Sequence, residues 1–172
     1  HSPPASSPCL LHGSLMGLAE PRTTYPSVPA ARPATTNPRL FAPPPRRATV
    51  STVGVAPTMR ALARDAPEAR LALSLHAPTQ TLRETIVPSS TAYPLDAIMA
   101  ALDEYLEGPP PRRRANAAEG SRSSKRRAML EYCVLGGVND TPACAAALGA
   151  LLGTPNRRGS GVSDLLPYTP PT

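Results

Sequence analysis

The sequence has few aromatic residues, few cysteines and no long apolar run. Its 172 residues include five tyrosines, one phenylalanine and no tryptophan, so we expect only part of the chain to pack into a core. No apolar run reaches the roughly 18 residues that a bilayer-spanning helix needs, and we therefore expect no membrane partner. Cys9, Cys133 and Cys144 are too far apart for a disulfide framework or a paired-cysteine metal site. A reducing compartment and no bound metal are the expectation.

Proline and positive charge, by contrast, are abundant. The 24 prolines are roughly three times the usual share, and residues 1–45 hold 11 of them. The net charge of +6 comes mainly from residues 1–50 and 109–127, where arginine and lysine far outnumber acids. Such segments can bind nucleic-acid phosphates, but solvated loops of the same composition are more common. Composition therefore predicts an irregular N-terminal part and a low-complexity basic loop over 109–127.

Between these segments, strand and helix patterns alternate. Apolar and β-branched runs predict strands over 48–55, 69–77, 128–135 and 162–168. Helical spacing predicts a helix opened by Pro57, one over 94–107 and one that Thr141 caps and Pro142 begins. The alternation implies βαβ units and a parallel sheet, either an open α/β sheet or a piece of a barrel.

Polar residues lie at the ends of these predicted strands. They are Ser51, Ser74 with His76, Asn139 with Asp140, and Thr169. Because parallel strands end at one edge of a sheet, we expect Ser51, Ser74 and His76 to meet there. Hydroxyl, imidazole and amide groups suit a polar ligand such as a nucleoside or an amino acid, and an ordinary strand end is the alternative. Cys133 and Cys144 are expected at core positions.

Several segments also resemble one enzyme family, in the same order along the chain. They are STVGVAP (51–57), LALSLHAP (71–78), LRETIVP (82–88), YPLDAIMAALDEYLE (93–107), EYCVLGGVND (131–140) and LLPYTP (165–170). Together they resemble the radical-SAM adenine-C2 methyltransferases of rRNA and tRNA, the RlmN type, with the C8-methylating Cfr type next. Upstream, MGLAEP (16–21) is similar to the family's MGMGEP motif, and Glu20 precedes Ser51 by 31 residues, as in the family.

The resemblance implies an α/β fold, a partial parallel (βα) barrel that binds S-adenosylmethionine at the carboxyl ends of its strands. It implies an irregular segment over 1–12 and a partial radical-SAM core over 13–172, with 109–127 as an inserted loop. In this match, Glu20 faces the amino group of the cofactor, and we expect it to converge with Ser51, Ser74 and His76 on one rim of the sheet. The cofactor-binding positions that the resemblance implies are Ala19, Glu20, Ser51, Ser74, Leu75, His76 and Thr169.

Some positions depart from the family pattern. Ala19 replaces a glycine and Thr169 an asparagine, and the chain contains neither the cysteine triplet that holds the family's 4Fe-4S cluster nor the methyl-carrying cysteine. We therefore expect a central fragment that supplies part of the S-adenosylmethionine site and is inactive alone. A degenerate non-catalytic α/β remnant and a C8-methylase fragment are the alternatives. For the complete enzyme, the resemblance implies 23S rRNA and tRNA as partners and a cytoplasmic location, or a plastid or other organelle in a eukaryote.

Overall fold

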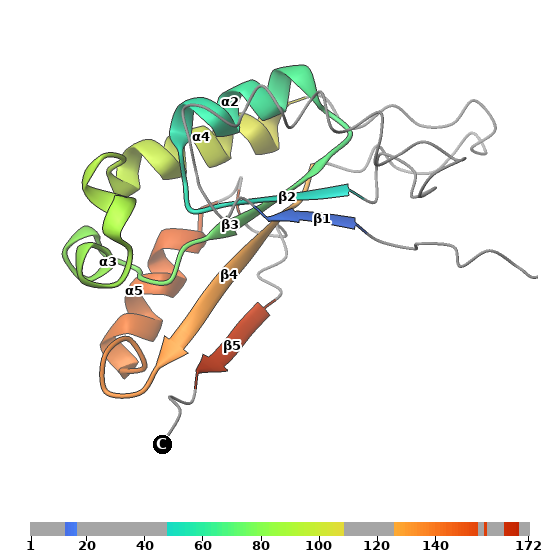
Figure 1. Ribbon diagram of the computed structural model, residues 1–172. Coiled ribbons are helices and arrows are strands. Elements are labelled where there is room, and N and C mark those ends of the chain that lie inside the picture. The colour runs from blue at the N-terminus through green and yellow to red at the C-terminus, as the bar shows by residue number, and fades with distance from the viewer. Residues whose placement is uncertain (1–12, 17–47, 109–125, 155–156, 158–163, 169–172) are drawn as a thin grey trace, which may run out of the picture.

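The computed structural model describes residues 13–16, 48–108, 126–154, 157 and 164–168. Within these ranges, five strands form one parallel sheet in which each strand pairs with the next along the chain (Figure 1). The α/β prediction with a parallel sheet is confirmed. The strands are β1 (Gly13–Met16), β2 (Ala48–Thr52), β3 (Arg70–Ser74), β4 (Ala128–Leu135) and β5 (Asp164–Tyr168).

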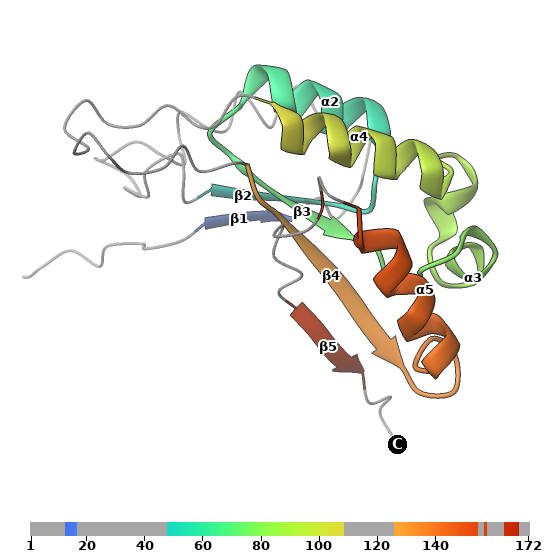
Figure 2. The same cartoon turned by 180° about the vertical axis from the view of Figure 1, so that it is seen from behind.

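Three helices follow the strands at the places that the sequence predicts. They are α2 (Ala56–Asp65), α4 (Leu95–Glu107) and α5 (Pro142–Leu152). Thr141 caps α5, since its hydroxyl oxygen accepts a hydrogen bond from the Cys144 amide at 3.2 Å. Figures 1 and 2 show α2 and α4 side by side over one face of the sheet, with α5 along β4. Among the described residues, none of the helices has both the length and the apolar character needed to span a bilayer.

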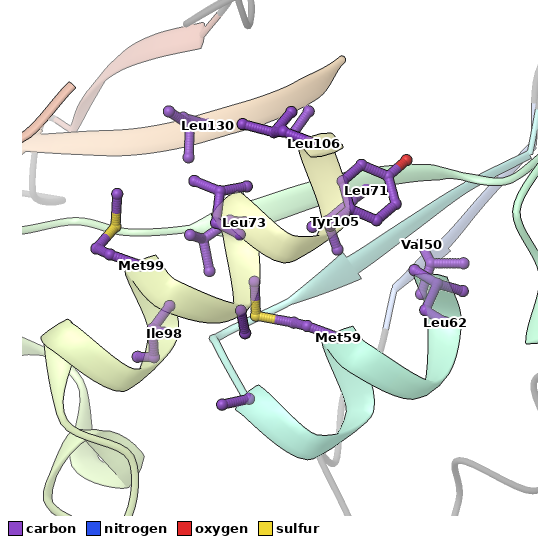
Figure 3. Packing of buried hydrophobic residues seen from close by; sticks show 14 of the residues in the cluster. Val50, Met59, Leu62, Leu71, Leu73, Ile98, Met99, Tyr105, Leu106 and Leu130 are labelled. Carbon is purple, nitrogen blue, oxygen red and sulfur yellow. The ribbon is translucent and has the colours of Figure 1, made fainter. Parts of the chain in front are cut away.

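The hydrophobic core lies between that face of the sheet and the helices. Alternate strand residues, including Val50, Leu71, Leu73 and Leu130, point toward the helices and are buried, because successive side chains of a strand face opposite ways. Figure 3 shows Met59 and Leu62 of α2 and Ile98, Met99 and Tyr105 of α4 packed against them. The apolar stripe predicted over 94–107 is therefore core packing.

Several predicted elements differ from those observed. The strands predicted over 48–55 and 69–77 are shorter in the structure, where β2 ends at Thr52 and β3 at Ser74. The chain turns after each of them, with positive φ at Gly54 and His76. β1 falls inside the segment 1–45 that composition predicts to be irregular; its four residues are held by pairing with β2. A short helix α3 (Gln80–Ile86) and a 3₁₀ helix η2 (Pro88–Thr91) were not predicted.

Arg126 is part of the packed structure, although it lies within the range predicted as a basic loop. It is only 4% exposed, and its guanidinium stacks 5.0 Å from the ring centre of Tyr105. It donates hydrogen bonds to the backbone oxygens of Ala63, at 3.1 Å, and Tyr105, at 3.4 Å. Both carbonyls lie in the last turns of helices, where a cation interacts favourably with the helix end. Arg126 therefore packs against the two helices, although it belongs to no helix or strand, and residues 109–125 of the predicted loop lie outside the described part of the chain.

Candidate functional site

Two predicted site residues, Ser51 and Ser74, lie on the same face of the sheet. We call this the far face, because it is opposite to the face that α2 and α4 cover. Ser51 pairs in register with Ala72, and Ser74 with Glu131. Since Val50, Leu71 and Leu73 point into the core, the residues that alternate with them point to the far face. Both serines lie near the carboxyl ends of neighbouring strands, with Ser51 in register with Ala72, two positions before Ser74. Their convergence on one rim with His76 and Glu20 stays a prediction.

A cross-strand hydrogen bond fixes the hydroxyl of Ser74. Its Oγ donates to Oε2 of Glu131 at 2.9 Å. A serine hydroxyl has one hydrogen and two lone pairs, so this bond leaves the lone pairs free to accept a hydrogen bond from a ligand. Glu131 was quoted within a family motif but not predicted as a site residue. The only sequence signal for it is an acidic residue in an otherwise apolar strand.

The predicted site residue Leu75 contributes its backbone. Its side chain is 1% exposed and belongs to the core. Its amide donates to the backbone oxygen of Glu131 at 2.9 Å, which continues the pairing of β3 with β4 beyond Ser74. Its carbonyl accepts from Nε of Arg83 at 3.2 Å. Leu75 therefore anchors the residues on either side of it, while its side chain faces away from the site.

His76 is held as a neutral imidazole. Its Nδ1 accepts a hydrogen bond from the backbone amide of Cys133 at 3.1 Å, which requires Nδ1 to carry no proton. Burial lowers the pKa of His76; the nearby charge of Arg83 adds to this effect and that of Glu131 opposes it. At neutral pH the ring therefore carries its proton on Nε2 and can donate it in a hydrogen bond.

Asn139, predicted as a strand-end polar residue, connects the strand ends from within. It is 2% exposed, and its Nδ2 donates to the backbone oxygens of His76 and Cys133, both at 2.8 Å. Its Oδ1 accepts from the Leu135 amide at 2.6 Å. By contrast, the neighbouring Asp140 is exposed and accepts from the Gly137 amide at 3.0 Å. Asn139 thus holds the site together, and Asp140 stabilises the turn.

Arg83 joins the ends of two strands and was not predicted. It belongs to α3, is 1% exposed, and donates to the backbone oxygens of Leu75 and Val53. These carbonyls follow β3 and β2, so the guanidinium holds the two carboxyl ends side by side. The sequence signal for Arg83 was its place within the motif LRETIVP. The short helix α3, which positions it, was not predicted.

The cysteines of the described part do not lie in the core, which corrects our expectation. Cys133 and Cys144 are both half-buried. Tyr132 occupies the buried position of β4, so the adjacent Cys133 falls on the far face. Within the described ranges, no three histidine, cysteine or acidic side chains are grouped to hold a metal. The chain's three cysteines also do not match the cysteine triplet of a 4Fe-4S site.

Three predicted site residues, Ala19, Glu20 and Thr169, lie outside the described residues, as does Cys9. The motif that holds Ala19 and Glu20 begins at Met16, the last residue of β1, and Met16 pairs in register with Ser51. The start of that motif therefore lies at the same edge as the residues above.

A separate groove lies on the helical side of the molecule. It has a volume of about 680 Å³ and is lined mainly by α4, with residues of α3 and α5 and with Arg157. Arg157 forms a two-point ion pair with Asp103, with N–O distances of 2.8 and 2.6 Å. None of the predicted site residues that the structure describes lines this groove, which makes it a distinct alternative to the strand-end site.

Comparison with known proteins gives consistent results for sequence and fold. No family model matches the sequence. A probable dual-specificity RNA methyltransferase RlmN 2 from Protochlamydia amoebophila is 35% identical over 92% of this chain and 39% of its own length. A probable dual-specificity RNA methyltransferase RlmN from Desulforudis audaxviator is 37% identical over 86% of this chain and 42% of its own length. The chain therefore spans less than half the length of these curated relatives.

A solved structure agrees with these relatives. The crystal structure of a radical SAM methyltransferase from Sphaerobacter thermophilus matches with a TM-score of 0.67 and 32% identity. The match covers 83% of this chain and 37% of that one. In sequence and in fold, this chain is thus a homologue of the RlmN-type radical-SAM RNA methyltransferases over part of their length.

Proposed function

We propose that this chain forms part of the S-adenosylmethionine site of an RNA methyltransferase that methylates C2 of adenine in 23S rRNA and tRNA. The observation that carries the proposal is that Ser51 and Ser74 lie on one face of neighbouring strands near their carboxyl ends. At the same ends, Ser74 bonds to Glu131 and His76 bonds to the Cys133 amide. The names of the relatives, which are dual-specificity RNA methyltransferases, support RNA as the substrate. We further propose that residues 13–172 form a partial radical-SAM core that works in the cytoplasm.

The chemistry of the edge suits S-adenosylmethionine. The lone pairs of Ser74 can accept from a ribose hydroxyl, and Nε2 of a neutral His76 can donate to a ribose oxygen or an adenine nitrogen. A carboxylate such as Glu20 suits the ammonium group of the cofactor. The proposed cofactor-binding residues also include Ala19, Ser51, Leu75 and Thr169. When bound, the cofactor supplies a transferable methyl group.

The chain does not fit the cluster that the family implies. A 4Fe-4S cluster needs several thiolates held together, and the three cysteines of this chain do not provide them. We therefore assign no step of the reaction to the cluster within this chain. The proposal is limited to binding and orienting S-adenosylmethionine.

A non-catalytic remnant is the second candidate function. Ala19 in place of a glycine, Thr169 in place of an asparagine and the high proline content favour it. Each lost hydrogen bond costs about 1 kcal/mol, or about 1.5–3 kcal/mol when one partner is charged. Two or three such losses reduce affinity by about two decades or more. We therefore expect the chain to bind S-adenosylmethionine with a dissociation constant in the millimolar range.

Saturation-transfer NMR can measure such weak binding. The proposal predicts transfer from the protein to S-adenosylmethionine, and an affinity about fivefold lower in Ser74→Ala, from the loss of one hydrogen bond worth about 1 kcal/mol. Ser89→Ala is the matched control, because Ser89 is exposed on η2 and should leave the affinity unchanged. The remnant hypothesis predicts no transfer in the wild-type chain. Equal binding by Ser74→Ala and the wild type would refute the strand-end site.

The position that is methylated needs a second experiment. Residues 13–172 can replace the matching part of a curated RlmN relative, and the methylated adenine of its RNA can be identified by mass spectrometry. Methyl at C2 is the predicted product. Methyl at C8 would instead support the alternative resemblance to the Cfr type.

A further inference from the structure

We infer that Asn139 is a positioning residue that fixes both the backbone and the ring of His76, so that a neutral imidazole presents its Nε2–H at the carboxyl edge of the sheet. The identity of the ligand that receives this donor rests on the proposed function. The positioning itself rests on geometry within the described residues, which can be tested without any ligand.

Asn139 uses every hydrogen-bonding group of its side-chain amide. Both hydrogens of Nδ2 are engaged, one by the carbonyl of His76 and one by that of Cys133, and Oδ1 accepts from the Leu135 amide. Its own backbone oxygen accepts from the hydroxyl of Tyr132 at 3.1 Å. A side chain that is 2% exposed and bonded in this way fixes three stretches of backbone in one arrangement.

The backbone conformation of His76 is unusual. Its φ is 59°, a left-handed conformation that few residues other than glycine adopt. The Ala77 amide donates to the Leu75 oxygen at 2.8 Å, which closes a three-residue turn around His76. Turns of this kind with positive φ are rare and strained, and such strain persists only where surrounding contacts hold it. The bond from Asn139 to the His76 oxygen is one of those contacts.

Asn139 also holds the backbone group that fixes the imidazole ring of His76. The Cys133 amide donates to Nδ1 of His76, and the carbonyl of the same residue accepts from Asn139. One side chain therefore holds the backbone of the imidazole and the backbone of its partner. Arg83 of α3 and Glu131 of β4 are the charged groups that face the ring. No hydrogen bond joins Nε2 to another residue of the described part, so this N–H remains available to a ligand.

A neutral donor matches the chemistry of the proposed cofactor. S-adenosylmethionine carries a positive sulfonium and a positive ammonium group, which an imidazolium would repel. A neutral Nε2–H instead offers a hydrogen bond to a ribose oxygen or an adenine nitrogen without adding positive charge. The hydrogen bonds from Asn139 and the Cys133 amide thus favour the neutral form of His76, which is compatible with a cationic nucleoside.

Solution NMR of the ¹⁵N-labelled 172-residue chain tests the positioning directly. A coupling across the hydrogen bond between the Cys133 amide nitrogen and Nδ1 of His76, with Nδ1 unprotonated, is the expected result. The chain has two other histidines, His1 and His12, so His76→Gln assigns the signal. A wild-type ring that carries its proton on Nδ1 would overturn the inference, whatever ligand is bound.

Variants separate positioning from general stability. In Asn139→Ala we expect the coupling to disappear, both ring tautomers to be populated and the pKa of His76 to rise toward its ordinary value. Asp140→Asn, in the same turn, should preserve the coupling, the single tautomer and the lowered pKa of His76. Asn139→Asp provides a second variant, because it keeps an acceptor for Leu135 but loses both donors. If the coupling persists in either Asn139 variant, the inference is wrong; if neither variant folds, the wild-type coupling decides.

Measuring the affinity of these variants for S-adenosylmethionine separates this inference from the proposed function. Affinity for S-adenosylmethionine should fall about tenfold in Asn139→Ala, as expected for one well-placed hydrogen bond, and should not change in Asp140→Asn. A wild-type chain that shows the coupling but binds no S-adenosylmethionine contradicts the proposed function and supports the positioning. Equal affinity of the wild type and Asn139→Ala for the cofactor would contradict the link between the positioning of His76 and cofactor binding.

Discussion

The cost of an added methyl group in the turn after β2 can be measured at Gly54, with Gly136 and Gly137 of the turn after β4 as references. Gly54 has a φ of 101°, and a methyl group added to it would lie 2.7 Å from Cδ1 of Ile98 in the core. Gly137 has a φ of 73° but no atom within 4 Å of such a methyl group. Gly136 has neither restriction. Alanine at each position therefore separates the cost of backbone conformation from the cost of packing.

The expected losses of stability differ in size. Gly136→Ala should change the free energy of unfolding by less than about 1 kcal/mol, in either direction. Gly137→Ala should cost about 1–2 kcal/mol, the price of a left-handed conformation for an L-residue. Gly54→Ala should cost about 2–5 kcal/mol, because overpacking adds about 1–3 kcal/mol to the same conformational term. For a chain of this length, 1 kcal/mol corresponds to about 2–4 °C in Tm.

Urea unfolding at equilibrium measures these differences, with an unchanged m-value as the sign that only stability has changed. Ile98→Val removes the Cδ1 atom that the added methyl group would meet, and alone should cost about 0.5–1.5 kcal/mol. Combined with Gly54→Ala it should cost less than the two changes separately, by about 1 kcal/mol. Equal stabilities of Gly54→Ala and Gly136→Ala would refute the close contact between this turn and α4.

Two further predictions concern titration and a buried cation. Because burial lowers the pKa of His76, the unfolded chain binds this proton first as the pH falls below about 6.5. Stability should therefore decrease from about pH 7 to pH 5, and His76→Gln should reduce that slope; an identical slope in urea unfolding would contradict the assignment. Arg126→Met should cost roughly 2–4 kcal/mol by loss of hydrogen bonds from a charged group to carbonyls, whereas Arg127→Met, at an exposed position, should cost almost nothing. Equal melting temperatures for the two variants would show that Arg126 does not hold α2 and α4.

The sequence predicted the longer elements well, for identifiable reasons. β4 was predicted over its observed range, and α4 within one residue, because eight apolar-rich residues and a four-turn stripe give clear patterns. β1 has four residues, and its strand character comes from pairing with β2, which lies more than 30 residues away. α3 has seven residues, of which the buried one is an arginine, so it has no apolar stripe to detect.

The site was predictable in part. The rule that parallel strands end together was enough to predict Ser51 and Ser74 near one edge of the sheet, whereas their shared face required the register between β2 and β3. Glu131 required the register between β3 and β4, since it becomes a partner of Ser74 only through that pairing. The role of Asn139 required the turn at His76, because its bonds reach backbone groups 63 and 6 residues away. Contacts between distant residues through backbone atoms leave no pattern in a single sequence.

Chemical-shift mapping with S-adenosylmethionine tests the central claim most directly. Amide signals of the ¹⁵N-labelled chain should shift on titration at Ser51–Thr52, at Ser74–Ala77 and at Glu131–Leu135, the residues around the carboxyl edge. The groove lined by Met99, Asp103 and Arg157 should show no shifts. Shifts confined to that groove, or absent at saturating cofactor, would contradict the account.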